Sequence, residues 1–302
     1  MSSKAYELIT EVKDLALVTT TGRDTAILRK LNQAQWQIYN SHNYWRGMEG
    51  VTTATTSDGV ETVNVPSAVS LIYTIRQTST APYAKLRYFH PTKFHEVLPQ
   101  PTQYSEGSPT CYTWWQGKLY LYPIPDATYT LTFYYYKKPV SMKVYSTGTA
   151  TYAASVVTGS STYFLDNSNV DTNMYFAYPA DIRSDGTLPW SAISAVTNDT
   201  TLTSTYLGNT ATGAFVCSSP TTFPEDFDTL LVYAAAILEC GRMRETADFA
   251  QYLSGQYTTM FGSLMDAQRN TPDYSPEASD FSSGGALVTG DAYLYPFIYE
   301  NR

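Results

Sequence analysis

The side chains best suited to catalysis or metal binding are few in this sequence, and their spacing keeps them apart. His90 and His95 lie five residues apart in the proline-flanked stretch PYAKLRYFHPTKFHEVLPQP. A pair of metal ligands is expected about four residues apart on a helix, or about two apart on a strand. The two histidines match neither spacing, so the sequence predicts no metal site here.

The other reactive groups give no stronger signal. Cys111, Cys217 and Cys240 lie far apart and form no C-x-x-C pair, so we expect buried free thiols in a reducing compartment. The segment DNSNVDTN (166–173) offers oxygen ligands but lacks the glycine and the final glutamate of a calcium loop. No phosphate-binding loop and no nucleophile motif occurs. We therefore expect no enzyme, no cofactor and no metal.

One stretch combines abundant aromatic surface with very little reactive chemistry. The segment GSPTCYTWWQGKLYLYPIPDATYTLTFYYYKKP (107–139) is rich in Tyr and Trp, and it contains a single acidic residue, Asp126, and no histidine. Tyrosine combines a rigid apolar body with a polar tip, which suits surfaces that become buried against a partner. A β-rich fold that fills its strands with tyrosine explains the same pattern, and the two interpretations are compatible.

Composition argues against tight binding of nucleic acid or insertion into a membrane. The 302-residue chain has a net charge of −8, and its basic residues are scattered, with no run longer than Lys137–Lys138. A phosphate-gripping protein is expected to carry a clustered basic face, although nucleic acid could still slide past this surface without sticking. The longest apolar run, LLVYAAAIL (230–238), is far shorter than the roughly 20 residues that span a bilayer. No secretory signal is visible, so we expect a soluble protein made in the cytoplasm.

Helical patterns are found near both ends of the chain and strand patterns between them. Apolar residues recur at helical spacing over residues 8–15, 24–41, 224–241 and 245–270. The segments CYTWW, KLYLYPI and TYTLTFYYYKKP alternate like strands and predict a three-stranded meander with two apolar faces. We expect one face to pack on the helices and the other on a neighbouring subunit.

These patterns predict an α+β fold with a helical bundle core, an aromatic β-meander and a small inserted all-β domain. Thr, Ser, Gly and Asn dominate the region assigned to the insert, where short strands alternate with turn clusters, as in a small sandwich or barrel. The expected divisions are 1–142 (helical pair and meander), 143–219 (inserted β-domain), 220–268 (second helical pair) and 269–302 (extended tail).

The tail ends in the aromatic segment AYLYPFIY after a strap rich in Pro, Ser, Gly and acidic residues (271–285). A disordered tail has no internal reason to carry so many large apolar side chains, so we interpret them as a docking anchor. Docking on its own chain is the alternative. The predicted anchor residues are Tyr293, Leu294, Tyr295, Phe297, Ile298 and Tyr299.

The order of the parts carries a resemblance that no single motif carries. The first part is the predicted helix ILRKLNQAQWQIYN, which leads into YWRG. The next part is the motif G-x-P-x-x-Y, formed by Gly107, Pro109 and Tyr112, and it is followed by the strands in LYLYPIPDATYTLTFYYYKKP. The last part is the helix that starts in FPEDFDTLLVYAAAILE. This layout resembles the head-to-tail adaptor proteins of tailed bacteriophages, also called head-completion or connector ring proteins. The resemblance covers most of the first 268 residues, and part of the β insert also looks like a module of such proteins.

The resemblance implies a structural virion protein at the head–tail junction, assembled in the host cytoplasm. It implies a dodecameric ring below the portal protein, a central channel through which DNA passes without sequence-specific binding, and a C-terminal segment docked on the portal. The β parts would meet the next tail component, a nozzle, stopper or tail tube. We expect the aromatic meander to form the surface between subunits, with the residues Trp114, Trp115, Tyr120, Tyr122, Tyr134 and Tyr136.

A tail-associated adhesin is the main alternative function. Its Tyr and Trp side chains would stack on sugars, and the β insert would be the carbohydrate module. Adhesins are usually built of strands throughout, and the amphipathic helices near both ends of this chain do not fit that class.

Overall fold

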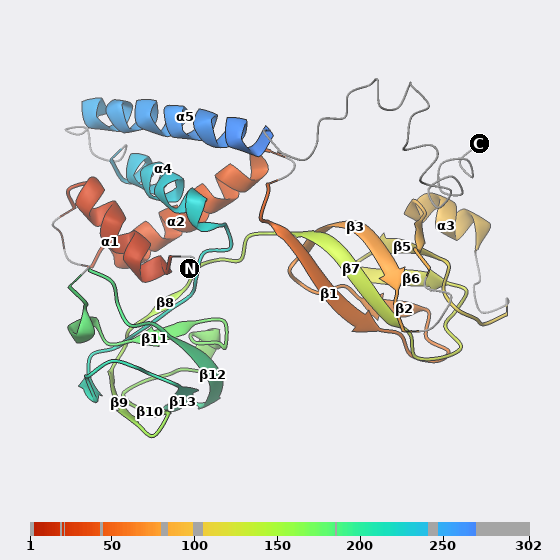
Figure 1. Ribbon diagram of the computed structural model, residues 1–302, viewed down its shortest axis with the longest axis horizontal. Coiled ribbons are helices and arrows are strands. Elements are labelled where there is room, and N and C mark those ends of the chain that lie inside the picture. Colours follow the sequence, from red (N-terminus) through yellow and green to blue (C-terminus); the bar gives the residue numbers. More distant parts are fainter. Residues whose placement is uncertain are drawn as a thin grey trace, which may run out of the picture. The chain divides into compact units, whose positions relative to one another are not determined.

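The computed structural model of the chain is shown in Figure 1. It describes residues 3–18, 20, 22–42, 45–79, 84–98, 105–184, 186–240 and 247–269. The chain divides into two compact units, Met1–Tyr257 and Thr258–Arg302, and the division falls within helix α5 (Ala247–Arg269). No helix of the described residues is long and apolar enough to cross a membrane.

Three helices of the first unit contact one another through apolar stripes: α1 (Ala5–Leu15), α2 (Asp24–Asn40) and α4 (Asp228–Cys240). Their buried side chains recur at three- and four-residue spacing, as an amphipathic helix requires. Full burial of one Leu or Ile side chain contributes about 1.5–3 kcal/mol. The fully buried branched aliphatic side chains on α1 and α2 are Leu8, Val12, Ile27, Leu31 and Ile38.

The segments before α4 and after α2 meet although they are far apart in the sequence. The Trp45 ring is almost completely buried and lies edge-on to Phe227, with 5.3 Å between ring centroids. Gly47 has a φ of +87°, and a β-carbon added there would lie 2.5 Å from Cγ of Pro224. Only glycine fits both the backbone conformation and this close approach. One packed junction therefore contains Trp45, Gly47, Pro224 and Phe227.

A buried ion cluster ties α2 to α4. The side chain of Glu239 is completely buried and accepts hydrogen bonds from Arg23 and Lys30. Lys30 Nζ also donates to the carbonyl oxygen of Leu238 at 2.8 Å. Burial by itself raises the pKa of Glu239, but the hydrogen bonds from Lys30 and Arg23 outweigh it and hold the pKa below its usual value. The glutamate is thus ionised and paired in the folded state.

Seven strands between the helices form two small sheets. The three-stranded sheet has the order β1 (Glu49–Thr55), β7 (Thr130–Lys137) and β3 (Val69–Gln77). The four-stranded sheet has the order β2 (Thr62–Asn64), β6 (Lys118–Tyr122), β5 (Cys111–Trp115) and β4 (Arg87–Tyr88). All pairs are antiparallel except β4 with β5.

The two sheets share one hydrophobic core and therefore pack face to face. We call this unit the first sandwich. Alternate residues of each strand point into the core, which follows from the two-residue period of a strand. The three-stranded sheet contributes Ile75, Leu131, Phe133 and Tyr135, and the four-stranded sheet contributes Val63, Tyr112, Leu119 and Leu121.

The remaining strands form an eight-stranded sheet. Its order is β14-β9-β10-β13-β12-β11-β15-β8, and every pair is antiparallel. The strands are β8 (Val144–Tyr145), β9 (Thr149–Ala153), β10 (Val156–Ser160), β11 (Tyr175–Ala177), β12 (Ser191–Asn198), β13 (Thr201–Ser204), β14 (Thr212–Gly213) and β15 (Val216–Ser218).

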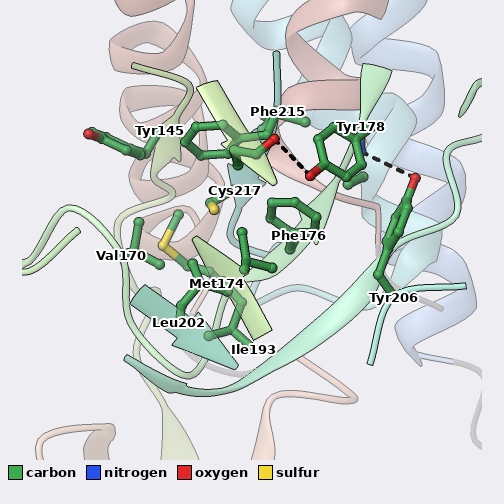
Figure 2. Packing of buried hydrophobic residues seen from close by; sticks show 14 of the residues in the cluster. Tyr145, Val170, Met174, Phe176, Tyr178, Ile193, Leu202, Tyr206, Phe215 and Cys217 are labelled. Atoms are coloured by element: carbon green, nitrogen blue, oxygen red, sulfur yellow. Dashed lines mark hydrogen bonds between the residues drawn. The ribbon is translucent and has the colours of Figure 1, made fainter. Parts of the chain in front are cut away.

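This sheet encloses an aromatic core of its own (Figure 2). Phe176 is stacked with Phe215 at 5.9 Å and lies edge-on to Tyr178 and Tyr206. The polar ends of the two tyrosines are satisfied inside the core. The Tyr178 hydroxyl donates to the carbonyl oxygen of Ala150 at 3.1 Å, and the Tyr206 hydroxyl accepts from the Tyr178 N–H at 3.3 Å. Burial raises the pKa of Tyr178 to about 12, so its hydroxyl stays neutral.

The predicted fold class is wrong. The chain is mostly β, with three sheets, one of them eight-stranded, and five helices among the described residues; it is not a helical bundle core with a small inserted domain. The first sandwich and the eight-stranded sheet each bury large side chains in a core of their own. Helical periodicity is a local signal, whereas these cores depend on pairing between distant strands.

The predicted three-stranded meander is wrong in its last strand. β5 and β6 form the expected hairpin, but β7 pairs with β1 and β3 in the other sheet. Pro123 and Pro125 lie in the connection between β6 and β7 and cannot donate to a sheet ladder. The chain crosses to the other sheet there, and the Tyr129 N–H then donates to Thr56 Oγ1 at 2.8 Å.

Candidate assembly surface

The six aromatic residues predicted to lie between subunits do not form one surface. Trp114 is opposite Leu119 in the β5–β6 register and packs against the core of the first sandwich. Tyr120 and Tyr122 lie on the outer face of the four-stranded sheet, as does Trp115, which is 50 % exposed. Tyr134 and Tyr136 lie on the outer face of the three-stranded sheet, on the other side of the sandwich. The structure thus divides the set between three environments.

The outer face of the four-stranded sheet is covered by helix α3 (Pro91–Val97) of the same chain (Figure 1). Phe94 and Leu98 are buried against Cys111, and Tyr120 and Tyr122 pack around them. Burial raises the pKa of the Cys111 thiol, which keeps it protonated and weakly reactive. Two tyrosines of the predicted intersubunit set therefore already have an intramolecular partner.

The outer face of the three-stranded sheet is apolar and exposed. Val51 is opposite Tyr134 and Leu71 is opposite Tyr136, so these side chains share one face. Tyr73 is 72 % exposed, Val51 61 % and Leu71 55 %. We call the surface formed by Val51, Leu71, Tyr73, Tyr134 and Tyr136 the open face.

Two ring contacts order the open face. The Tyr73 and Tyr136 rings meet edge to face with centroids 6.5 Å apart, and the Arg76 guanidinium lies over the Tyr134 ring at 5.1 Å. A cation over an aromatic ring contributes about 0.5–1 kcal/mol at an exposed site. The sequence analysis missed Val51, Leu71 and Tyr73. In VSLIYTIRQ, however, apolar residues occur on both alternating faces of the strand, which is the pattern of a strand covered on both sides.

A hollow of about 410 Å³ lies between α1 and the loop that precedes β12. The Glu7 carboxylate at its wall accepts hydrogen bonds from Trp190 Nε1 at 2.7 Å and from the Lys4 N–H at 3.0 Å. Burial raises the pKa of Glu11, and the nearby carboxylates of Asp228 and Glu7 raise it further. The described lining includes the hydroxyls of Ser3 and Thr10 and the carboxylates of Glu7 and Glu11, but no cysteine or histidine.

The sulfur and imidazole groups remain apart in the fold. Cys111, Cys217 and Cys240 are free and buried, and burial raises the pKa of each thiol. Within the described ranges, no three His, Cys, Asp or Glu side chains converge in a way that could hold a metal ion. His95 lies edge-on to the Tyr120 ring with centroids 5.8 Å apart, a packing contact of α3.

The predicted docking tail cannot be placed. Its residues lie outside the described part of the chain and are Tyr293, Leu294, Tyr295, Phe297, Ile298 and Tyr299. Their role stays a prediction from the sequence.

The comparison with protein families agrees with the resemblance seen in the sequence. No curated protein matches the chain. The model of the SU10 adaptor protein family matches residues 3–160, more than half of the 302-residue chain, and so covers α1, α2, the first sandwich and the first strands of the eight-stranded sheet. That family consists of structural adaptors of phage virions and is not an enzyme family. The chain belongs to the SU10 adaptor protein family and is a phage head-to-tail adaptor.

Proposed function

We propose that the chain forms a dodecameric ring at the head–tail junction, between the portal protein and the next tail component. The family match over residues 3–160 carries this proposal, because an adaptor must bind one component on each side. Copies in the ring leave a central channel through which DNA passes. The net charge of −8 suits a channel that must not retain DNA. The carbohydrate-binding alternative is not retained, because the family is one of structural adaptors.

The composition of the exposed surface supports a permanently assembled protein. Standing interfaces bury about 2,000–5,000 Å² and are richer in apolar residues than ordinary surfaces. Charged residues form only 15 % of this chain, so few ions lose their water when such an interface forms. The open face supplies large exposed apolar side chains of the kind that interfaces use.

We further propose that the C-terminal segment anchors each copy on the portal protein and that the eight-stranded sheet faces the next tail component. The segment 271–302 combines acidic residues with a cluster of large apolar side chains at its end. An aromatic segment of this kind can bury its apolar side chains in a groove of a partner. The next component would be a nozzle, stopper or tail tube.

Labelling of virions tests this function directly. An antibody to the eight-stranded region should mark the neck between head and tail, and image averaging should show a ring at that position. Deleting 286–302 should reduce attachment to purified portal rings without changing the unfolding temperature of the remaining chain. Label on fibres or baseplate would refute the adaptor role, and unchanged attachment of the truncated chain would refute the anchor.

A further inference from the structure

A surface loop of the eight-stranded region carries two large exposed apolar side chains. The loop is the segment 161–170 between β10 and β11, and we call it the Tyr163 loop. Tyr163 is 56 % exposed and Leu165 is 49 % exposed, whereas Phe164 between them is completely buried in the aromatic core. The two exposed side chains therefore lie on either side of one buried anchor.

Hydrogen bonds from successive backbone groups hold the Tyr163 loop in one conformation. The Tyr163 N–H donates to the hydroxyl of Tyr145 at 2.7 Å, and the Tyr145 ring belongs to the aromatic core (Figure 2). The N–H groups of Leu165 and Asp166 both donate to the Asp199 carboxylate, at 2.9 and 3.2 Å. The loop is thus tied both to β8, which contains Tyr145, and to the turn between β12 and β13, which contains Asp199.

Close packing at the start of the Tyr163 loop fixes it further. A β-carbon added to Gly148 would lie 2.7 Å from the carbonyl oxygen of Ser161, and one added to Gly159 would lie 2.1 Å from Thr162 Oγ1. The Thr162 hydroxyl donates to the carbonyl oxygen of Asp199 at 2.8 Å. A loop that is already ordered before binding loses little conformational entropy on binding, so more of the energy of burying its side chains appears as affinity.

The backbone of the Tyr163 loop is strained at three residues that are not glycine. Ser161, Asn167 and Ser168 have φ angles of 58°, 50° and 53°. Such conformations persist only where the surrounding contacts enforce them, and they are concentrated at functional sites. Order, strain and exposed apolar side chains together indicate a binding loop.

The charges around the loop are mostly negative. Asp166 is exposed within the loop, and Asp199 lies beneath it. Lys143 also contacts the loop, donating to the carbonyl oxygen of Ser168 at 2.9 Å, but its ammonium is paired with the carboxylate of Asp171 at 3.4 Å. One carboxylate thus offsets the charge of this lysine, and the charges of Asp166 and Asp199 remain.

This negative charge selects the class of partner. Residues 143–219 contain five acidic and two basic residues, which gives this region a net charge of −3. DNA phosphates and the anionic headgroups of a membrane would be repelled by it. A protein pocket with Lys or Arg at its rim would be attracted, and opposite charges of this kind speed the encounter of two proteins.

We propose that the Tyr163 loop inserts Tyr163 and Leu165 into an apolar pocket of the next tail component, and that Lys or Arg side chains at the rim of this pocket face Asp166. This inference rests on the proposed function, in which the eight-stranded region faces that component. It names the residues that make the contact and the chemistry of the partner surface. A second copy of this chain is the rival occupant, and the experiment below separates the two.

Photo-cross-linking in assembled virions tests the contact. A phenylalanine analogue with a benzophenone side chain is placed at position 163 of the full chain, and the cross-linked proteins are identified by mass spectrometry. We expect a product with one tail protein that is neither the portal protein nor this chain. The matched control carries the same analogue at position 207, because Leu207 is 81 % exposed and follows β13 at the end opposite to Asp199. It should not give that product.

Three cross-linking results would overturn the inference. A product with a second copy of this chain would place the Tyr163 loop between subunits, and a product with the portal protein would place it toward the head. The third is the absence of any product at position 163 in virions that contain the altered chain. Antibody labelling of the neck reports the position of the chain independently, so a chain found at the neck without this contact refutes the inference and leaves the adaptor function intact.

Attachment of purified tails to tailless heads that carry this adaptor gives a second test. Tyr163→Ala should weaken attachment about tenfold or more, because a Tyr held on an ordered loop is a typical interface hot spot. Leu207→Ala should attach tails like the unmodified chain. Both side chains are exposed, so neither change should shift the unfolding temperature. Normal tail attachment by the Tyr163→Ala variant would refute the contact.

The charge of the partner surface is tested by reversing the charge of Asp166. Asp166→Lys should slow the association of tails with these heads, and the difference from the unmodified chain should shrink as salt screens the charges. Association that is as fast as that of the unmodified chain, or faster, at low salt would show that no basic rim faces the Tyr163 loop.

Discussion

Individual residues of this chain stabilise the fold at junctions between distant segments. Glu239 shows this best, since its fully buried carboxylate pairs with Lys30 of α2 and with Arg23 just before that helix. Removing one partner of a buried ion pair leaves an uncompensated charge and typically costs about 3–5 kcal/mol. Both cations are about a fifth exposed and can recover some hydration, so the lower end of that range applies.

We therefore expect Glu239→Gln to lower the free energy of unfolding by about 3 kcal/mol, measured by urea denaturation. The folded-state pKa of Glu239 is lowered, so its stabilisation is present above the unfolded pKa of about 4.3 and is lost as pH falls through the folded pKa. The variant should consequently lose less stability than the unmodified chain on acidification. Glu96→Gln is the control, because its ion pair is exposed and should change stability by under about 0.5 kcal/mol.

Asp181 connects two loops of the eight-stranded region through hydrogen bonds. Its carboxylate accepts from the Tyr206 hydroxyl at 2.6 Å, from Thr210 Oγ1 at 2.6 Å and from the Thr210 N–H at 2.9 Å. Burial by itself raises the pKa of Asp181, but the hydrogen bonds from Thr210 and Tyr206 outweigh it and lower the pKa. A β-carbon at Gly208 would lie 2.2 Å from the Tyr206 hydroxyl and 2.4 Å from the carboxylate.

Asp181→Asn and Gly208→Ala should each destabilise the chain by about 1.5–3 kcal/mol, the usual contribution of hydrogen bonds to a charged group. Because both changes disturb the same contacts, the double variant should lose less than the sum of the two losses. Chemical denaturation of all four chains gives the cycle. Strict additivity would show that Gly208 acts independently of the carboxylate.

At the scale of elements, α3 is the helix that covers the outer face of the four-stranded sheet. It is a short helix of Pro91–Val97, and an isolated helix of that length is not stable in water. Phe94 therefore holds it in place, through burial against Cys111 and Leu98. The amphipathic pattern of α3 is weak in the sequence because one buried side chain carries most of the contact.

Phe94→Ala should expose the Cys111 thiol and destabilise the first sandwich by about 3–5 kcal/mol, as a large-to-small change in a core does. The specific readout is the rate of thiol labelling under native conditions, which should rise at Cys111 and stay unchanged at Cys217 in the other core. Val97→Ala is the control, since that side chain is largely exposed and should leave labelling unchanged. Equal labelling of Cys111 in both variants would show that α3 does not protect it.

At the scale of the first unit, helix α1 joins the helices to the eight-stranded sheet. The Ala5 N–H donates to the carbonyl oxygen of Ser219 at 3.0 Å, and the Tyr6 N–H donates to Ser218 Oγ at 3.0 Å. Glu7 completes the junction by accepting from Trp190 Nε1 at 2.7 Å. These three hydrogen bonds hold α1 against the eight-stranded region.

Trp190→Phe should remove the indole donor while keeping most of the apolar ring, and it should destabilise the chain by about 1.5–3 kcal/mol because the lost hydrogen bond ends on a carboxylate. Thermal unfolding followed by circular dichroism measures the loss. Thr10→Val on the exposed side of α1 removes only an exposed hydroxyl and serves as control. Equal effects of the two changes would show that Glu7–Trp190 is not a junction contact.

The sequence by itself determined the signals that are local or compositional. The spacing of Leu8, Val12, Ile27 and Leu31 predicted the helices, the alternation in KLYLY predicted a strand, and the order of motifs pointed to the adaptor family before the family match confirmed it. Each of these signals depends on a few neighbouring residues, so it can be interpreted without knowing which strands pair.

Only the tertiary structure decided which strands pair and which faces remain exposed. β7 alternates in a way that fits any sheet, and only the fold pairs it with β1 and β3, which moves Tyr134 and Tyr136 to the side opposite Tyr120. The sequence analysis did not predict the predominance of β structure for the same reason. Pairing between strands that are far apart in the chain cannot be inferred from the residue pattern of either strand alone. The open face follows from that pairing and from α3 covering the other sheet.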